Sequence, residues 1–202
     1  MNRSFLGRAG LLLALACPLA MTSCSYHKMN APPPASGATT CQGCTVFNLS
    51  VWHVRADQRD LMKLLKVSRH ISPESLNSDS TEIVSSASAE GIAERLFKDR
   101  RSQNIVRYAG STTEGEPLPV ALSNTYDSYS ATLTAGPEIR RLASRVVKFS
   151  LSARLPSADS GITGDEVHES GRVMLKDGDT VVTVHSVRDG WLVWLIGARF
   201  SA

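Results

Sequence analysis

The sequence predicts an α+β domain in which one strand and two helices precede a C-terminal antiparallel β-sheet. Three observations predict this fold class. Helical spacing of apolar residues is confined to two segments before residue 103, VKFSLSARL alternates strictly between apolar and polar residues, and Asp-Gly pairs separate the last apolar runs. We expect one domain over residues 45–202, a length sufficient to bury a single hydrophobic core.

The N-terminal part of this domain combines the strand with the two helices. TVFNLSVWHV, which begins at Thr45, is rich in β-branched and aromatic residues and favours a strand. DQRDLMKLLKVSRH has leucines at helical spacing after two aspartates, and acids suit the positive end of a helix dipole. SASAEGIAERLFKDRRS repeats that spacing and ends in Lys98, Arg100 and Arg101, which we interpret as a solvated helix end rather than a contact surface.

The C-terminal part is predicted to be β-structure. NIVRYAGS favours a short strand and GEPLP a turn, and the alternation over residues 147–155 predicts a strand with one buried and one exposed face. Residues 172–200 read as three strands, divided at Asp177-Gly178 and at Asp189-Gly190. Because Asp-Gly supplies the positive φ angles that tight hairpins require, we expect an antiparallel meander.

The last of these strands, WLVWLIGARF, is apolar on both faces. A tilted strand of about 9 to 11 residues can cross a bilayer as part of a closed assembly. A strand at the centre of a soluble sandwich has the same composition. We favour the sandwich, because a single hairpin leaves polar edges that a bilayer does not tolerate.

The first 23 residues have the layout of a secretory signal. Arg3 and Arg8 are the only charges before the run AGLLLALACPLA, which is too short for a membrane-spanning helix of about 20 residues. The following residues, Met21 to Cys24, resemble the lipobox of bacterial lipoproteins, whose cysteine is acylated and becomes the mature N-terminus. The resemblance implies a lipid such as palmitate on Cys24. Because serine rather than aspartate follows, it also implies the periplasmic face of the outer membrane.

Two alternatives remain open for this leader. Cys17 is a second candidate for the modified residue, although its apolar core is very short and Pro18 follows it. An ordinary cleavable signal without a lipid is the other alternative. In each case residues 24–44, rich in Pro, Ser and Thr, read as a tether that holds the domain away from the bilayer.

Cys41 and Cys44 form the motif CQGC at the end of the tether. In an oxidising compartment, an even pair left over after lipidation of Cys24 predicts a local disulfide. The same spacing occurs in redox pairs and in half of a zinc site. Since no second CxxC and no histidine at ligand spacing accompanies the motif, we expect a structural disulfide, with neither a metal nor a cofactor.

The charge balance argues against a nucleic-acid partner. Two of the 22 lysines and arginines lie in the leader, whereas all 19 acids follow it, so the remaining chain has a formal charge of +1. A protein that binds a polyanion needs a strongly basic face.

Sequence motifs for catalysis are missing from the chain. It contains no GxSxG, HExxH, Walker loop or dinucleotide fingerprint, and its SxxK match, Ser25 to Lys28, directly follows Cys24 in the tether. The five histidines are His27, His53, His70, His168 and His185. We therefore expect a non-enzymatic protein. A stand-alone periplasmic hydrolase or a small-ligand-binding lipoprotein is the alternative. A buried polar cleft joining His53, His168 or His185 to an acid would favour the hydrolase.

The C-terminal half resembles the C-terminal domain of secretins, the outer-membrane ring proteins of type II and III secretion and type IV pilus systems. GEPLPVALSNTYDSYSATL, a long alternating strand and LKDGDTVVTVHSV follow in the family's order. Gly115-Glu116 and Asp177-Gly178-Asp179-Thr180 occupy the places of its glycine-containing turn and its hairpin. Thr183-Val184-His185 replaces the usual Gly-Gly, and the repeated ring-forming domains are missing.

These departures point away from a gated channel and toward a reduced relative or an accessory subunit. The resemblance implies a lipid-anchored structural or adaptor component of a secretion or type IV pilus apparatus. Its partners would be envelope proteins of that machine, with the membrane contacted through the N-terminal lipid. A homo-oligomer is compatible with this role.

Overall fold

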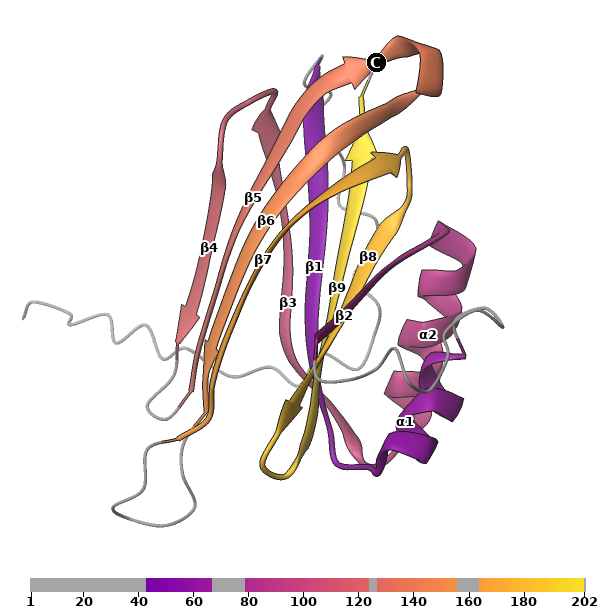
Figure 1. The fold of residues 1–202 in the computed structure, drawn as a ribbon, viewed down its shortest axis with the longest axis vertical. Coiled ribbons are helices and arrows are strands. Elements are labelled where there is room, and N and C mark those ends of the chain that lie inside the picture. Colours follow the sequence, from indigo (N-terminus) through magenta and orange to yellow (C-terminus); the bar gives the residue numbers. More distant parts are fainter. Residues whose placement is uncertain (1–42, 67–78, 124–126, 156–163, 202) are drawn as a thin grey trace, which may run out of the picture. The chain divides into compact units, whose positions relative to one another are not determined.

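The computed structural model describes residues 43–66, 79–123, 127–155 and 164–201. These residues form a β-sandwich with two helices packed on one side (Figure 1). The elements in chain order are β1 (Cys44–Val54), α1 (Gln58–Leu65), β2 (Asp79–Val84), α2 (Ser86–Lys98), β3 (Ser102–Thr113), β4 (Leu118–Ser123), β5 (Ser128–Ile139), the 3₁₀ helix η2 (Arg140–Leu142), β6 (Ser144–Arg154), β7 (Glu166–Lys176), β8 (Thr180–Val187) and β9 (Gly190–Phe200).

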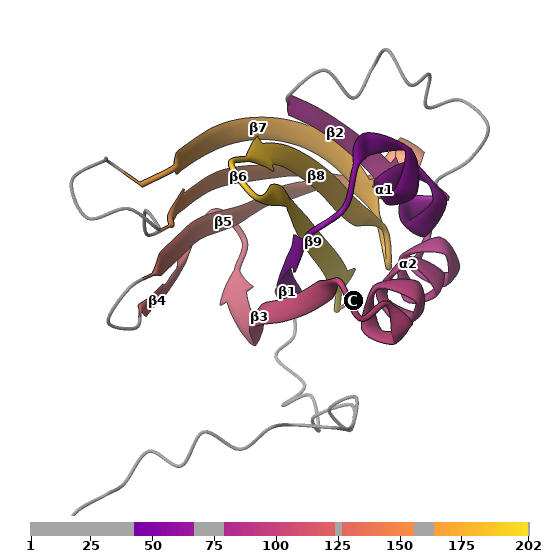
Figure 2. The same ribbon diagram turned by 90° about the horizontal axis from the view of Figure 1, so that it is seen from below.

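The strands form two antiparallel sheets. Sheet A has the order β2-β8-β9-β1-β3, and sheet B has the order β4-β5-β6-β7. The two sheets face each other, and both helices lie against the side of sheet A that is turned away from sheet B (Figure 2). The chain crosses between the sheets twice at their ends, from β3 to β4 and from β7 to β8.

The predicted α+β fold is wrong, because the protein is mainly β. Both predicted helices are present, but α1 ends at Leu65 and the longer α2 at Lys98. Between them lies β2, which the sequence did not indicate, and this strand pairs with β8 at the edge of sheet A. The helices cover only one face of one sheet, so contact between the two sheets provides the larger core.

The double-sided apolar character of β9 follows from its place near the middle of sheet A. Leu192, Trp194 and Ile196 point into the core between the sheets. Val193 and Leu195 point the other way and pack against the helices. This arrangement agrees with the interpretation of WLVWLIGARF as a central sandwich strand. No helix among the described residues is long and apolar enough to span a membrane.

One of the two predicted Asp-Gly hairpins is confirmed and the other is wrong. β8 and β9 pair directly, with Val187 opposite Gly190. At Gly178, however, the chain leaves sheet B for sheet A, since β7 pairs with β6 and not with β8. Gly178 has the positive φ that a turn requires, 82°. The difference in burial explains why β7 and β8 do not pair with each other. β8 is buried on both faces and lies within sheet A between β2 and β9, whereas β7 has one exposed face and lies at the edge of sheet B.

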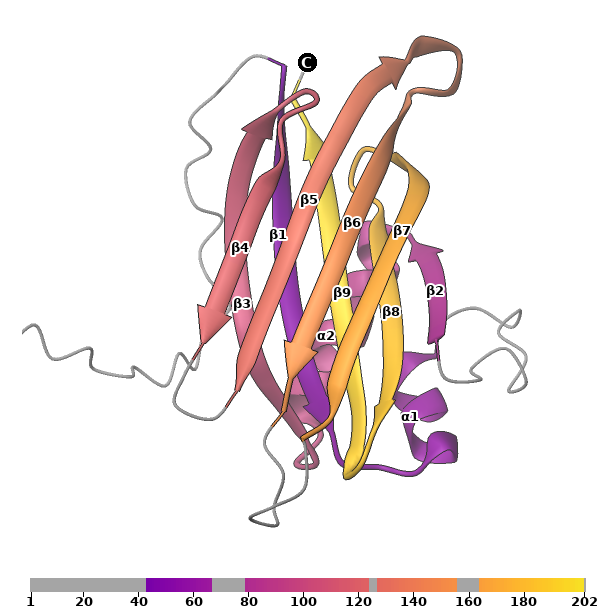
Figure 3. The ribbon, with the colours of Figure 1, turned by 60° about the vertical axis from the view of Figure 1, so that its left-hand side comes forward.

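The alternation in VKFSLSARL is confirmed in β6. Val147, Phe149 and Leu151 are buried in the core between the sheets, and the polar residues between them lie on the outer face of sheet B. The outer face of sheet B is therefore largely polar. No other element among the described residues covers this face (Figure 3).

Candidate functional site

The predicted attachment and disulfide residues lie at the margin of the described chain. Cys24 and Cys41 fall outside the described residues, as do His27 and His70. Cys44 is the first residue of β1 and is buried, and its carbonyl oxygen accepts hydrogen bonds from the backbone N–H (3.0 Å) and the hydroxyl (2.7 Å) of Ser201. The lipid on Cys24 and the Cys41–Cys44 disulfide therefore stay predictions. The chain enters the domain beside the end of β9.

The fold brings His185, one of the histidines considered for a catalytic role, next to an acid between the two sheets. His185 on β8 and Glu169 on β7 belong to different sheets, and Nε2 of His185 lies 2.6 Å from Oε2 of Glu169. The hydroxyl of Thr81 on β2 donates to Oε1 of Glu169 at 2.6 Å. The hydroxyl of Thr183 lies 3.1 Å from the same His185 nitrogen. We call these four residues the inter-sheet cluster.

Burial and hydrogen bonding act in opposite directions on Glu169. Burial raises the pKa of its carboxyl because the charged form loses contact with water, but the hydrogen bonds from His185 and Thr81 outweigh that effect. The pKa of Glu169 therefore lies below its usual value. Glu169 is ionised at neutral pH and is an acceptor for both neighbours.

The inter-sheet cluster does not have the geometry of an activated nucleophile. In a Ser-His-Asp triad the acid contacts one ring nitrogen and the nucleophilic hydroxyl contacts the other. In this protein Glu169 and the hydroxyl of Thr183 both face Nε2 of His185. Thr183 is fully buried, so its hydroxyl is not open to a substrate. The arrangement suits a polar contact that holds the two sheets together better than it suits acyl transfer.

Two other histidines named in the sequence analysis also contact acids. His53 on β1 lies 2.9 Å from Oδ1 of Asp189 in the β8–β9 turn, and Arg55 donates to the other oxygen of that carboxylate at 3.3 Å. His168 lies 3.1 Å from Glu166, and both side chains are exposed on the outer face of β7. Among these three pairs, only His185 and Glu169 are both largely buried. No group of His, Cys, Asp and Glu in the described ranges could hold a metal ion.

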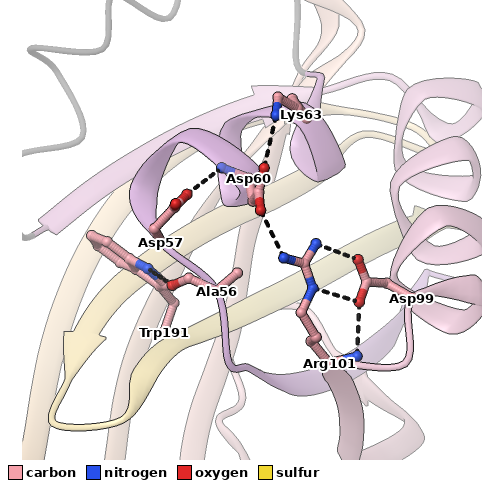
Figure 4. A network of polar contacts seen from close by, with 7 residues as sticks. All are labelled: Ala56, Asp57, Asp60, Lys63, Asp99, Arg101 and Trp191. Atoms are coloured by element: carbon pink, nitrogen blue, oxygen red, sulfur yellow. Dashed lines mark hydrogen bonds and ion pairs between the residues drawn. The ribbon is translucent and has the colours of Figure 1, made fainter.

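An ion network on the surface joins α1 to the connection between α2 and β3 (Figure 4). The guanidinium of Arg101 contacts Asp60 at 2.7 Å and Asp99 at 3.0 Å, and Lys63 contacts Asp60 at 2.8 Å. The contacts of Asp60, chiefly the hydrogen bond from Lys63 and then that from Arg101, lower its pKa to about 2. This part of the predicted basic cluster therefore has a role in positioning the helices.

The remaining candidate site is the outer edge of β3. This strand has 12 residues and pairs only with β1, so in the described chain its other edge has no strand partner. Arg107 is its only charged residue, and it contains no proline. The sequence predicted only a short strand in this segment, and nothing in a single strand's composition shows that it lies at an edge.

The other edge strands of the two sheets are protected in ways that natural proteins commonly use. β4 contains Pro119, β2 has only six residues, and the exposed face of β7 carries several charged side chains. Charges, prolines and short length prevent an edge from pairing with a foreign strand. β3 lacks all three protections except for its single arginine, so it is the edge best suited to accept another strand.

Comparisons with protein-family models, with curated proteins and with solved structures found no match to this chain.

Proposed function

We propose that this protein is a lipid-anchored, non-enzymatic structural or adaptor protein on the periplasmic face of the outer membrane. The lipobox-like residues before Cys24 and the tether of residues 24–44 support the anchor. The observation that carries the adaptor role is the outer edge of β3, a long and nearly uncharged strand that pairs with no other strand on that side among the described residues. The secretin-like order of segments in the C-terminal half directs the search for partners to secretion and type IV pilus proteins, although the turn at Asp177-Gly178 joins the two sheets and is not the hairpin that this resemblance implied.

The proposed mechanism combines confinement with strand addition. A lipid on Cys24 holds the domain at one surface and raises its effective concentration near partners that are held there. A partner segment in extended conformation then adds to β3 through backbone hydrogen bonds. Side chains at alternate positions, including Ala109 and Ser111, are exposed and small, so they allow a second strand to approach.

The test is a mild-detergent extraction of the native protein from membranes, followed by size analysis and mass spectrometry. Three variants accompany the wild type: Cys24→Ala, Ser111→Lys on the β3 edge strand, and Ser130→Lys as a control on the central strand β5. Both serines are exposed, so the two lysine variants add the same charge without changing the core.

We expect wild type and Ser130→Lys to run in a large complex with identifiable envelope proteins. Ser111→Lys should stay in the membrane but leave the complex, and Cys24→Ala should be released as a soluble monomer. A complex that survives Ser111→Lys would refute the role of the β3 edge. A lone wild-type monomer with an unmodified Cys24 would refute both anchor and adaptor, and activity and ligand screens would then test the hydrolase and ligand-binding alternatives.

A further inference from the structure

One end of the outer face of sheet B carries a cluster of cations. We call it the basic patch, and it consists of Arg140, Arg141, Lys148, Arg172 and Lys176, all of them exposed. The strand register makes the patch continuous, because Lys148 of β6 lies opposite Arg172 of β7, and Lys176 extends β7 two rows further. The two arginines come from η2, which joins β5 to β6 at the same end.

The cations of the basic patch have no acidic partners among the described residues. Elsewhere on the domain, exposed cations such as Lys98, Arg101 and Arg154 contact carboxylates. None of the five patch residues forms an ion pair within the described ranges. Three acids lie close in the sequence to this end of the patch, since Glu138 precedes η2 and Asp177 and Asp179 follow β7. Asp177 and Asp179 accept hydrogen bonds from the backbone N–H groups of Phe200 and Lys176. The five cations outnumber these acids. The patch therefore concentrates positive charge on a chain that is almost neutral overall.

Two large apolar side chains are exposed within the basic patch. Leu142 of η2 is 52% exposed, and Met174 of β7 is 46% exposed. Met174 lies opposite the half-buried Val146 in the register, one row from the Lys148–Arg172 pair. Exposed apolar residues ringed by cations are typical of surfaces that lie in the interface of a membrane with anionic lipids.

The basic patch lies at the end of the domain where the tether arrives. Cys44, the first residue of β1, is bonded to Ser201, which follows β9. The ring of Phe200 at the end of β9 lies 5.2 Å from the guanidinium of Arg145, at the start of β6. Figures 1 and 3 show the start of β1, the end of β9 and the β5–β6 connection at the same end of the sandwich. The described chain therefore begins at the end of the domain that carries the basic patch.

We propose that the basic patch binds the headgroups of anionic phospholipids and so orients the domain against the membrane that its lipid occupies. This inference deepens the proposed function. It rests on the proposed lipid anchor in one respect, because the anchor decides which membrane the basic patch meets. A lipid chain and a polybasic surface are the two signals that together give stable membrane attachment. With the patch on the bilayer, the tether does not hold the domain away from the membrane, as its composition suggested, and the domain has one defined orientation rather than free rotation.

The test measures binding of the Cys24→Ala chain, which has no lipid of its own, to sedimenting vesicles. Vesicles of phosphatidylcholine alone are compared with vesicles that also contain phosphatidylglycerol, at low and high salt. The patch variant combines Lys148→Gln, Arg172→Gln and Lys176→Gln. The control variant combines Arg59→Gln, Lys66→Gln and Arg100→Gln, which removes the same charge from exposed residues near the helices.

We expect binding only to the phosphatidylglycerol vesicles, weakened by salt because exposed charges are screened. The patch variant should bind on the order of 100-fold more weakly, since each cation near an anionic surface contributes a several-fold gain. The control variant should keep wild-type binding. Equal loss in both variants, or no loss in the patch variant, would overturn the proposal.

A further variant, Met174→Ser, separates the apolar contribution from that of the charges, because it keeps every charge. Insertion of the methionine into the interface predicts a loss of roughly tenfold. Unchanged vesicle binding would overturn the insertion of Met174 and would show that the headgroup contacts of the cations account for the whole of the binding. The chain in these assays has no lipid, so the vesicle assay and the mass spectrometry of the native protein are independent. Vesicle binding can fail while a lipid is found on Cys24, and vesicle binding can succeed while Cys24 is found unmodified. The two proposals are therefore refuted separately.

Discussion

The inter-sheet cluster allows a direct test of what holds the two sheets together at their β7 and β8 side. In the variant His185→Leu, the carboxylate of Glu169 loses the partner that lies 2.6 Å away and keeps the hydroxyl of Thr81 and a weaker hydrogen bond from Thr183. Removing one partner of a buried ion pair usually destabilises a protein by about 3–5 kcal/mol, because the other charge stays buried and uncompensated. Glu169 retains 14% exposure of its side chain, so we expect the lower end, about 3 kcal/mol.

The double variant Glu169→Leu/His185→Leu isolates the cause of this loss. It removes the stranded carboxylate, and apolar replacement of a buried ion pair is often neutral or stabilising. The hydroxyl of Thr183 loses its His185 partner in both variants, whereas its weaker hydrogen bond to Glu169 is lost only in the double variant. The double variant should therefore be more stable than His185→Leu by about 2 kcal/mol or more.

The pH dependence has a definite sign. The pKa of Glu169 in the folded protein is below its usual value, so its contribution to stability is present above the unfolded pKa of about 4.3 and is lost as the pH falls through the folded pKa. In His185→Leu the main cause of the lowered pKa is gone, and burial raises the pKa of the carboxyl instead. The difference in free energy of unfolding between wild type and His185→Leu should therefore begin to shrink above about pH 4.3, as the carboxyl of the variant is protonated, and should shrink further as the pH falls through the lowered pKa of Glu169 in the wild type.

The assay is urea unfolding of the Cys24→Ala chain, followed by tryptophan fluorescence at neutral and acidic pH. Trp194 is fully buried in the core between the sheets, so its fluorescence changes when that core is exposed to water. The reasoning would be refuted if His185→Leu lost less than about 1 kcal/mol at neutral pH, or if the double variant were as unstable as the single one.

Three further predictions concern the turn, the core and the ion network. Gly190→Ala should destabilise the domain strongly, because φ is 144° and a Cβ would collide with the carbonyl oxygen of Val54; unfolding close to that of wild type would contradict this. Ile196→Ala should cost about 2–5 kcal/mol in urea unfolding, since the side chain is fully buried between the sheets, and a loss below about 1 kcal/mol would show that the core collapses around the cavity. Lys63→Ala should raise the pKa of Asp60 from about 2 toward its ordinary value in an NMR titration, and an unchanged pKa would show that Arg101 alone controls it.

Local periodicity in the sequence determined several elements by itself. The strict alternation in VKFSLSARL predicted β6 and its buried face, and two helical patterns predicted α1 and α2. Asp189-Gly190 predicted the β8–β9 hairpin. These features depend on contacts between near neighbours along the chain, which a short window of residues can specify.

The tertiary structure alone decided the fold class, the sheet to which each strand belongs and the composition of the candidate sites. Asp177-Gly178 has the residues of a hairpin turn, yet it joins β7 of sheet B to β8 of sheet A. Glu169 and His185 meet only because of that crossing, and the basic patch forms only because η2, β6 and β7 come together at one end. The physical reason is that pairing between strands is chosen by competition for buried surface over the whole domain, which no local pattern records.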